Sequence, residues 1–455
     1  MDMSDGGMGE LPRRAAARTA RLASLPLTYA GRQALGLGKR LGGQPAELVV
    51  TEIQQRTAEQ LFRTLGELKG GAMKFGQMLS VLEAAIPEQY AAPYRAQLTR
   101  LQDSAPPMPT QTVRDILTAD LGPDWPERLI RLDGAPTAAA SIGQVHRGRW
   151  VDAPGEEPRE VAVKVQYPHA GDALASDLKQ LSRVARTMGP LVPGMDVRAL
   201  VDELRTRVME ELDYDLEAAA QRAFEVGFRD DPDIVVPSVV AVGPTTLITT
   251  WMDSPASLAQ VIDQGTQEER DHYGALFARF LFSGPGRTGM LHADPHPGNY
   301  RLLPHEDGTP GRLGVLDYGA VARLPGHAFP SAMGRLIRLA IEGDTAALET
   351  GLREEGFVRD KVRIDAAQLL EFLRPFVVPA EEETFVFSRG WMRQEFNRIN
   401  DPRSPGYTAA LRLNLPPSYL LIHRTWIAGL GVLSQLGAEV PVRSIMADCL
   451  PGFAT

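Results

Sequence analysis

The chain of 455 residues has a single cysteine, Cys449, so no disulfide can form within it. A fold without disulfides suits a reducing compartment, and we expect a cytoplasmic protein. The sequence also lacks a long apolar run, and no segment of the signal-peptide type follows Met1. The longest uncharged apolar run late in the chain, residues 425–438, has 14 residues, whereas a membrane-spanning helix needs about 20. The sequence therefore predicts no transmembrane helix.

Acidic residues outnumber basic ones, 57 to 48, but basic residues are concentrated near the N-terminus. The net charge of −9 argues against a nucleic-acid-binding protein. Residues 11–46 nevertheless carry seven basic side chains and no acidic one. Interleaved Leu, Ala and Tyr make this a candidate membrane-surface segment, which would hold the protein peripherally at the inner face of a membrane. A solvated tail is the alternative, and an Arg-rich, acid-poor transit peptide is a third.

The length predicts two or three domains, and the pattern of apolar residues suggests where they lie. In residues 50–82 apolar side chains recur mostly every three or four positions, as on one face of a helix, with an interruption at Gly70-Gly71. The proline-rich stretch 104–109 follows as a stiff linker. We therefore expect residues 1–46 to be a basic segment and residues 47–130 to be a helical extension.

After Asp133-Gly134 the composition changes. Three short runs have β-type composition: 145–151, 160–167 and 247–252. A loop rich in Pro, Gly and acidic residues joins the first two, as in a hairpin, and a helical region, about 172–228, follows the second. From Leu258 onward the pattern is mainly helical. We predict a bilobal α+β fold, with an N-lobe and inserted helices over residues 131–255 and a helical C-lobe over residues 256–455.

The decapeptide LHADPHPGNY, residues 291–300, concentrates polar groups and rigid turns. A zinc site would use His292, Asp294 and His296. However, Pro295 and Pro297 exclude a regular central strand, and no further cluster of Cys or His completes a closed tetrahedral site. A purely structural turn is a second interpretation.

The third interpretation is a phosphotransferase catalytic loop, because His292, Asp294 and Asn299 have its spacing. There the aspartate orients the attacking hydroxyl and the asparagine binds Mg²⁺. Such a loop needs a second metal carboxylate, and Asp317 supplies one in GVLDYGA, eighteen residues after Asn299. An isolated Asp-x-Gly is common in turns, but at this distance from the loop it is informative.

Two further features agree with a nucleotide site. Lys164 lies in the β-type run EVAVKVQY, which is similar to the strand that carries the phosphate-binding lysine of kinases; an edge lysine that discourages aggregation is the alternative. Upstream, alanines replace the expected glycines of a phosphate-covering loop, and alanine does not readily adopt a positive φ. Nucleotide would then be held differently, with an altered ATP/ADP preference. The candidate contact residues here are Ala138, Ala139, Ala140, Ser141, Ile142 and Gly143.

Taken together and in order, these motifs resemble the ABC1/ADCK/UbiB (AarF-like) atypical kinase family. Its Lys-x-Gly-Gln motif is matched by MKFGQMLS, with Lys74 and Gln77, and its Glu-x-Asp motif by Glu211 and Asp213. The resemblance covers about residues 48–440 and implies a protein kinase-like fold with an N-terminal helical element packed over the active site.

The resemblance also implies roles for the residues. MgATP would bind between the lobes, with adenine near residues 250–253 and hence beside Trp251 and Met252. Lys164 would hold phosphates, while Asn299 and Asp317 would hold Mg²⁺. Lys74 and Gln77 would approach the phosphates or the acidic motif. We expect Glu211 to pair with Lys164 or Lys74, with Asp213 and Glu217 nearby.

The function that the resemblance implies is that of a Mg²⁺-dependent ATPase or phosphotransferase coupled to membrane lipid or isoprenoid-quinone metabolism. A lipid or prenyl-quinone-like molecule is then a candidate ligand. Two alternatives stay open. One is a small-molecule phosphotransferase of the aminoglycoside or choline kinase type, which HADPHPGN also fits. The other is a scaffold that binds nucleotide without turning it over and so controls a partner.

Overall fold

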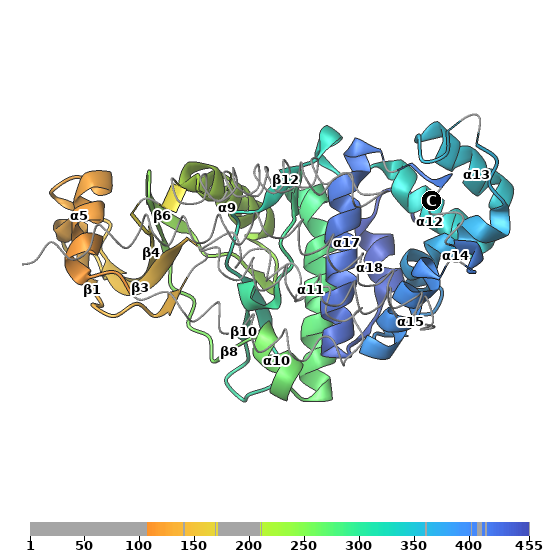
Figure 1. The fold of residues 1–455 in the computed structure, drawn as a ribbon. Helices are drawn as coiled ribbons and strands as arrows, with labels where there is room; N and C mark the ends of the chain where they lie inside the picture. Colours follow the sequence, from red (N-terminus) through yellow and green to blue (C-terminus); the bar gives the residue numbers. More distant parts are fainter. Residues whose placement is uncertain are drawn as a thin grey trace, which may run out of the picture.

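The computed structural model supports a kinase-like arrangement of a small sheet-containing lobe and a larger, mainly helical lobe (Figure 1). It describes residues 107–139, 142–168, 170–171, 210, 212–359, 362–401, 403–406, 412–414 and 416–454. The predicted basic segment and almost all of the predicted helical extension lie outside these residues. The predicted bilobal α+β fold is confirmed for the described part of the chain.

The N-lobe is built on an antiparallel sheet with strand order β1-β3-β4-β7-β6, in which β2 also pairs with β3. The strands are β1 (Leu129–Leu132), β2 (Ala138–Ala139), β3 (Gly143–Trp150), β4 (Arg159–Gln166), β6 (Val239–Gly243) and β7 (Thr246–Thr250). Strands β3 and β4 form the predicted hairpin. Val161, Val163 and Val165 alternate along β4 with their side chains fully buried, as period-two patterning requires.

Helices α5 (Thr110–Leu121) and α6 (Trp125–Arg128) cover this sheet. Val113 and Leu117 of α5 pack in one cluster with the buried valines of β4. Asp120 then accepts hydrogen bonds from the backbone N–H and the hydroxyl of Thr245, at 2.8 and 2.9 Å, which ties α5 to the β6–β7 turn.

Helix α9 (Tyr214–Phe228) lies between the sheet and the C-lobe. Asp213 caps it by accepting a hydrogen bond from Leu216 N at 3.0 Å, as expected of a carboxylate at an N-cap. Beyond its C-terminus, the buried carboxylate of Asp231 accepts hydrogen bonds from Arg279 and Arg287, at 2.9 and 2.7 Å. Both ends of α9 are therefore fixed.

A second sheet, in the order β5-β11-β10-β8, carries the segments around the decapeptide. Its strands are β5 (Ile234–Val235), β8 (Ala256–Ser257), β10 (Tyr300–Leu303) and β11 (Arg312–Val315). Next to it, β9 (Met290–His292) pairs with β12 (Val321–Arg323). The decapeptide begins in β9 and ends at the start of β10. Because β10 pairs with β11, which ends at Val315, the decapeptide lies close to the Asp317 segment.

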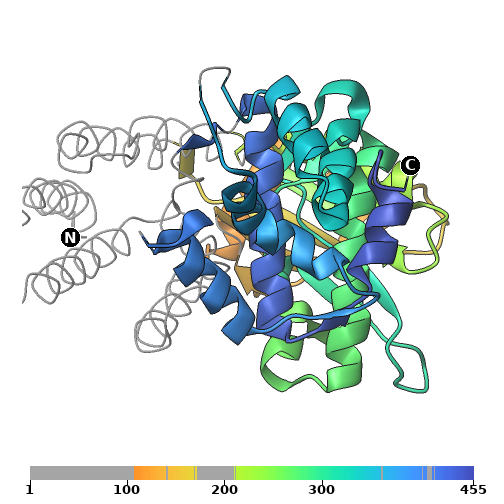
Figure 2. The same ribbon diagram turned by 90° about the vertical axis from the view of Figure 1, so that its right-hand side faces the viewer.

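The rest of the C-lobe is mainly helical (Figure 2). Its helices are α10 (Leu258–Gln264), α11 (Gln267–Thr288), α12 (Ser331–Glu342), α13 (Thr345–Glu354), α14 (Ala366–Val377), α15 (Arg389–Asn400), α17 (Pro417–Leu436) and α18 (Val442–Cys449). Helices α10, α17 and α18 contact α11, whereas α12, α13 and α14 pack against one another. A short sheet pairs β13 (Phe385–Val386) with β14 (Glu439–Val440). The apolar run at 425–438 lies mostly in α17, and no helix among the described residues is long and apolar enough to span a membrane.

Candidate functional site

The site begins with an ion pair between the N-lobe sheet and helix α9. Lys164 on β4 donates hydrogen bonds to both carboxylate oxygens of Glu217 on α9, at 2.8 and 2.9 Å. The Glu217 side chain is 3% exposed and that of Lys164 is 18% exposed, so the pair is largely shielded from water. The sequence-based expectation that Glu211 pairs with Lys164 is therefore corrected: the partner is Glu217, and Glu211 lies outside the described residues.

Two opposing effects act on the Lys164 ammonium. Burial lowers its pKa, but the carboxylates of Glu217 and Asp317 outweigh burial, and the pKa of Lys164 is raised well above its ordinary value. The Tyr214 ring, 5.1 Å from Lys164 Nζ to its centroid, adds a cation–π attraction. At neutral pH the lysine is a fixed positive charge, which suits a phosphate ligand.

Asp317 lies beside this pair. Its Oδ1 accepts a hydrogen bond from Gly319 N at 2.9 Å. A Cβ atom built on Gly319 would lie 3.3 Å from Asp317 Oδ1 and 3.5 Å from Glu217 Oε2. Gly319 therefore adjoins both carboxylates, and the structure brings Asp317 and the Lys164–Glu217 pair together.

The decapeptide forms a compact loop after β9. The 3-10 helix η3 (Pro297–Asn299) begins after His296, whose Nδ1 accepts a hydrogen bond from Gly298 N at 3.1 Å. The side-chain amide of Asn299 faces Asp294. Its Nδ2 lies 3.4 Å from the backbone O of Asp294 and 3.4 Å from Asp294 Oδ2. This contact fixes the aspartate and leaves the amide oxygen of Asn299 to act as a metal ligand.

The loop is bonded directly to the segment that carries Asp317. Leu316 N donates to Asn299 O, and Ala293 N donates to Ala320 O, both at 2.9 Å. Asn299 and Asp317 thus offer one amide oxygen and one carboxylate from adjacent segments, a set that suits Mg²⁺, which usually keeps several waters. Within the described part of the chain, no group of three or more His, Cys, Asp or Glu side chains is placed to hold a metal, as a zinc site would need.

His292 braces the loop from inside the protein. Its Nε2 lies 2.6 Å from Asp317 O, and its side chain is buried. The rings of Phe224, Phe280, Tyr300 and Tyr318 surround it, with centroids 5.4–6.2 Å away. Burial raises the pKa of both tyrosines well above its ordinary value, so their phenols stay protonated. This packing connects the catalytic loop, the Asp317 segment and helix α9.

The alanine-rich stretch forms the beginning of a hairpin. Ala138 pairs with Val145 and Ala139 pairs with Gln144, so β2 and β3 flank the predicted phosphate-covering segment. Ile142 is buried. Gly143 has a role other than loop flexibility, because a Cβ atom there would lie 2.2 Å from Val165 O. The glycine permits close contact between β3 and β4 next to Lys164.

The segment after β7 connects the lobes where adenine is expected. Trp251 N donates to Glu160 O at 2.9 Å, and the Arg147 guanidinium lies 5.0 Å from the centroid of the Trp251 ring. Met252 packs against β11, because its Sδ would lie 1.9 Å from a Cβ atom on Gly314. Both candidate adenine contacts are thus at the hinge.

Several predicted site residues lie outside the described part of the chain. They are Lys74, Gln77, Ala140, Ser141 and Glu211. Their expected roles stay predictions, including the approach of the Lys-x-Gly-Gln motif to the phosphates.

The sequence did contain a signal for Glu217. Tyr214, Glu217, Gln221, Phe224 and Phe228 follow one another at steps of three and four and are all buried in α9. Glu217 is therefore on the inward face of the helix. Helix α9 begins after the N-cap Asp213, whereas the sequence pattern predicted one helical region over about 172–228 that included both acids.

Comparisons with known proteins agree with this geometry. Residues 100–350 match the family model of the ABC1 atypical kinase-like domain. The chain is 31% identical over 72% of its length to "Atypical kinase coq-8, mitochondrial" of Caenorhabditis elegans, covering 42% of that protein. It is 29% identical over 91% of its length to "Atypical kinase COQ8, mitochondrial" of Schizosaccharomyces pombe, covering 66% of that protein. The chain thus spans between two fifths and two thirds of these two relatives.

A solved structure matches this chain over the whole of its own length. The complex of Rv3197 with erythromycin from Mycobacterium tuberculosis is 41% identical, with a TM-score of 0.68, over 90% of this chain and 100% of that one. An identity of 41% over this length shows similarity in sequence as well as in fold.

Proposed function

Because the chain belongs to the ABC1 atypical kinase-like family, we propose that it is an ATP-dependent enzyme that uses Mg²⁺ to cleave the terminal phosphate of ATP. The observation that carries the proposal is the shielded Lys164–Glu217 pair beside Asp317. Kinases need such a lysine, held by an acid on a helix, together with a metal-binding aspartate.

The position of each residue suggests a separate role in this reaction. Lys164, fixed by Glu217, would bind the phosphates of the nucleotide. Asn299 and Asp317 would hold Mg²⁺, which when bound neutralises charge on the phosphate oxygens. The backbone bonds between their two segments keep these ligands in register. Most of the catalysis would come from this electrostatic positioning.

Asp294 would orient the attacking group. Asp294 is partly buried and its carboxylate contacts the Asn299 amide, so the direction of the carboxylate is restrained. In this position it can accept a hydrogen bond from a hydroxyl or a water that approaches the terminal phosphate. Water as acceptor gives an ATPase; an alcohol gives a phosphotransferase.

We extend the proposal to the metabolism that the enzyme serves and to its location at a membrane. The relatives are named mitochondrial atypical kinases, and the family resemblance points to isoprenoid-quinone or membrane lipid metabolism. The basic residues 11–46 would hold the protein peripherally on an anionic membrane. Removal of these residues should abolish sedimentation with anionic vesicles; unchanged sedimentation would contradict this part of the proposal.

The mycobacterial structure supports a second, compatible candidate function. That protein is described in complex with erythromycin, and the 41% identity makes this chain a candidate macrolide-binding protein. Calorimetric titration of the full chain with erythromycin tests it directly, and the absence of heat at saturating erythromycin would rule it out.

The main proposal is tested by ADP release from MgATP, with and without anionic liposomes. Asp317→Asn and Asp294→Asn serve as inactive controls. We expect release by the wild-type chain, greater release with liposomes, and a loss of at least 100-fold in Asp317→Asn. Nucleotide binding without release above the two variants would instead favour a nucleotide-gated scaffold. Rapid phosphorylation of a soluble alcohol would favour a small-molecule phosphotransferase.

A further inference from the structure

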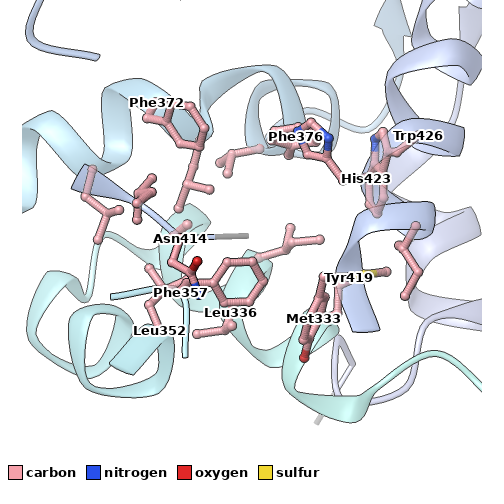
Figure 3. A pocket seen from close by; sticks show the side chains of 17 residues that line it. Met333, Leu336, Leu352, Phe357, Phe372, Phe376, Asn414, Tyr419, His423 and Trp426 are labelled. Carbon is pink, nitrogen blue, oxygen red and sulfur yellow. The ribbon is translucent and has the colours of Figure 1, made fainter. Parts of the chain in front are cut away.

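The helical part of the C-lobe contains an apolar pocket that the nucleotide chemistry does not use. It has a volume of about 270 Å³ and lies between helices α12, α13, α14 and α17 (Figure 3). The side chains of Phe357, Phe372, Phe376 and Trp426 form much of its wall, and aliphatic side chains form most of the rest. A pocket with an apolar wall of this kind can accept an apolar ligand.

The polar groups in the wall are engaged with the protein or uncharged. Tyr419 donates its hydroxyl hydrogen to Glu355 Oε2 at 2.7 Å, and the amide of Asn414 donates to Gly356 O at 3.0 Å. Burial lowers the pKa of His423, so its ring is neutral at pH 7. The pocket therefore offers hydrocarbon contacts and no fixed charge, which excludes an anionic headgroup inside it.

A smaller cavity of about 40 Å³ shares the lining residues Ile422 and Trp426 with the pocket. Thr425 lines this second cavity and is only 4% exposed, yet its hydroxyl has no hydrogen-bond partner within the described residues. A buried hydroxyl without a partner destabilises the free protein. The Thr425 hydroxyl could therefore form a hydrogen bond with one polar group of a ligand.

We propose that the two cavities form one binding site for a neutral amphiphile with a single small polar group. The hydrocarbon part would fill the larger pocket and the polar group would reach Thr425. A cavity of about 150 Å³ holds one benzene, so by proportion a pocket of about 270 Å³ holds roughly ten carbon atoms. This is the size of a short acyl chain or of two isoprene units, and it is smaller than the pockets of about 300–1,000 Å³ that hold drug-sized ligands.

The proposed binding site reaches strand β9, which leads into the decapeptide loop. Leu291 lines the smaller cavity and precedes His292, the residue that braces Asp317. Phe282 and Phe329 line the same cavity, and a ligand there would also contact Leu291 of strand β9. The site is distinct from the proposed nucleotide site, and the inference stands independently of the ATPase proposal.

Two ten-carbon alcohols test the proposal. Geraniol is methyl-branched like an isoprenoid, and 1-decanol is unbranched like an acyl chain. Calorimetric titration of the full chain should show saturable binding of at least one, with a negative heat-capacity change from apolar burial. The tighter of the two identifies the source class. If the folded protein binds neither, the proposal is overturned.

Variants locate the binding. Ala340 lines the pocket from α12, and Ala340→Phe should fill it and weaken binding at least ten-fold. Ala346→Phe makes the same change at an exposed position on α13 and should have no effect. If Ala340→Phe does not fold, Leu373→Trp fills the pocket from α14 instead. Unchanged affinity in a folded filling variant would place the ligand elsewhere and refute the site.

Thr425→Val tests the polar end of the site. The substitution keeps the shape and removes the hydroxyl, so the affinity for the alcohols should fall about two- to ten-fold, the value of one hydrogen bond. Binding of decane, which has no hydroxyl, should not change. Equal loss for decane and 1-decanol would show that Thr425 gives no hydrogen bond and would overturn this part of the assignment.

Discussion

Lys164 Nζ on strand β4 lies 2.8 and 2.9 Å from the two carboxylate oxygens of Glu217 on helix α9. The bond joins the sheet of the N-lobe to a helix that also packs, through Phe224, on His292 and Tyr318. One helix therefore positions Lys164 and contacts the residue that braces Asp317. Under the proposed function, α9 would couple the binding of nucleotide to the binding of metal.

The first prediction concerns this pair. Glu217→Gln removes the charge that holds Lys164, and it should weaken ATP binding and ADP release at least ten-fold. It should also lower the free energy of unfolding by about 1–3 kcal/mol, because a buried ammonium loses its charged partner. Titration with nucleotide and chemical denaturation measure the two effects. Asp215→Asn, at an exposed position of the same helix, is the matched control and should behave as wild type.

The sequence allowed much of this site to be predicted because the motifs are local. Asp294 and Asn299 belong to one loop, and Lys164 lies in a strand whose alternating valines are visible in the sequence. Asp317 follows an apolar strand at a short distance along the chain. For these residues the predicted arrangement and the observed arrangement agree in which segments come together.

Other features depend on contacts between distant segments. The choice between Glu211 and Glu217 depends on where α9 begins, and the cap at Asp213 decides that. The aromatic surround of His292 takes its rings from α9, α11, β10 and the Asp317 segment. The apolar pocket requires four helices and their connections. No single stretch of sequence carries a pattern for such arrangements.

The aromatic cluster gives a second prediction. Phe224 is fully buried against His292, Tyr318 and Phe280, so Phe224→Ala should cost about 3–5 kcal/mol of unfolding free energy. Because the cavity lies between α9 and the Asp317 segment, kcat for ADP release should fall more than the affinity for nucleotide. Phe224→Leu should restore most of both. Equal activity per folded molecule in the Ala variant would show that the cluster serves stability alone.

The third prediction is a pH dependence from the apolar pocket. Burial lowers the pKa of His423 below its ordinary 6.5, so the unfolded chain binds a proton at this residue before the folded chain does. Stability is therefore lost as the pH falls from 6.5 toward the lowered pKa. In His423→Leu, the free energy of unfolding should fall less steeply over this range than in wild type. Denaturant unfolding at several pH values measures both slopes, and equal slopes would contradict the effect.

The fourth prediction concerns the glycine beside the phosphate-covering loop. In Gly143→Ala the new methyl group would lie 2.2 Å from Val165 O, and strands β3 and β4 would have to separate next to Lys164. The cost should be about 1–3 kcal/mol, as for other overpacked sites, with weaker nucleotide binding because the lysine moves with its strand.

Gly134→Ala is the control for this change. A Cβ atom there would meet only Thr110 Oγ1, at 3.7 Å, an ordinary contact, so stability and nucleotide affinity should both stay near wild type. Differential denaturation and nucleotide titration of the two variants separate the effects. If Gly143→Ala keeps full nucleotide affinity while losing stability, the glycine serves only the packing of the strands. If both fall together, the close approach of β3 to β4 is what sets the position of Lys164 over the nucleotide.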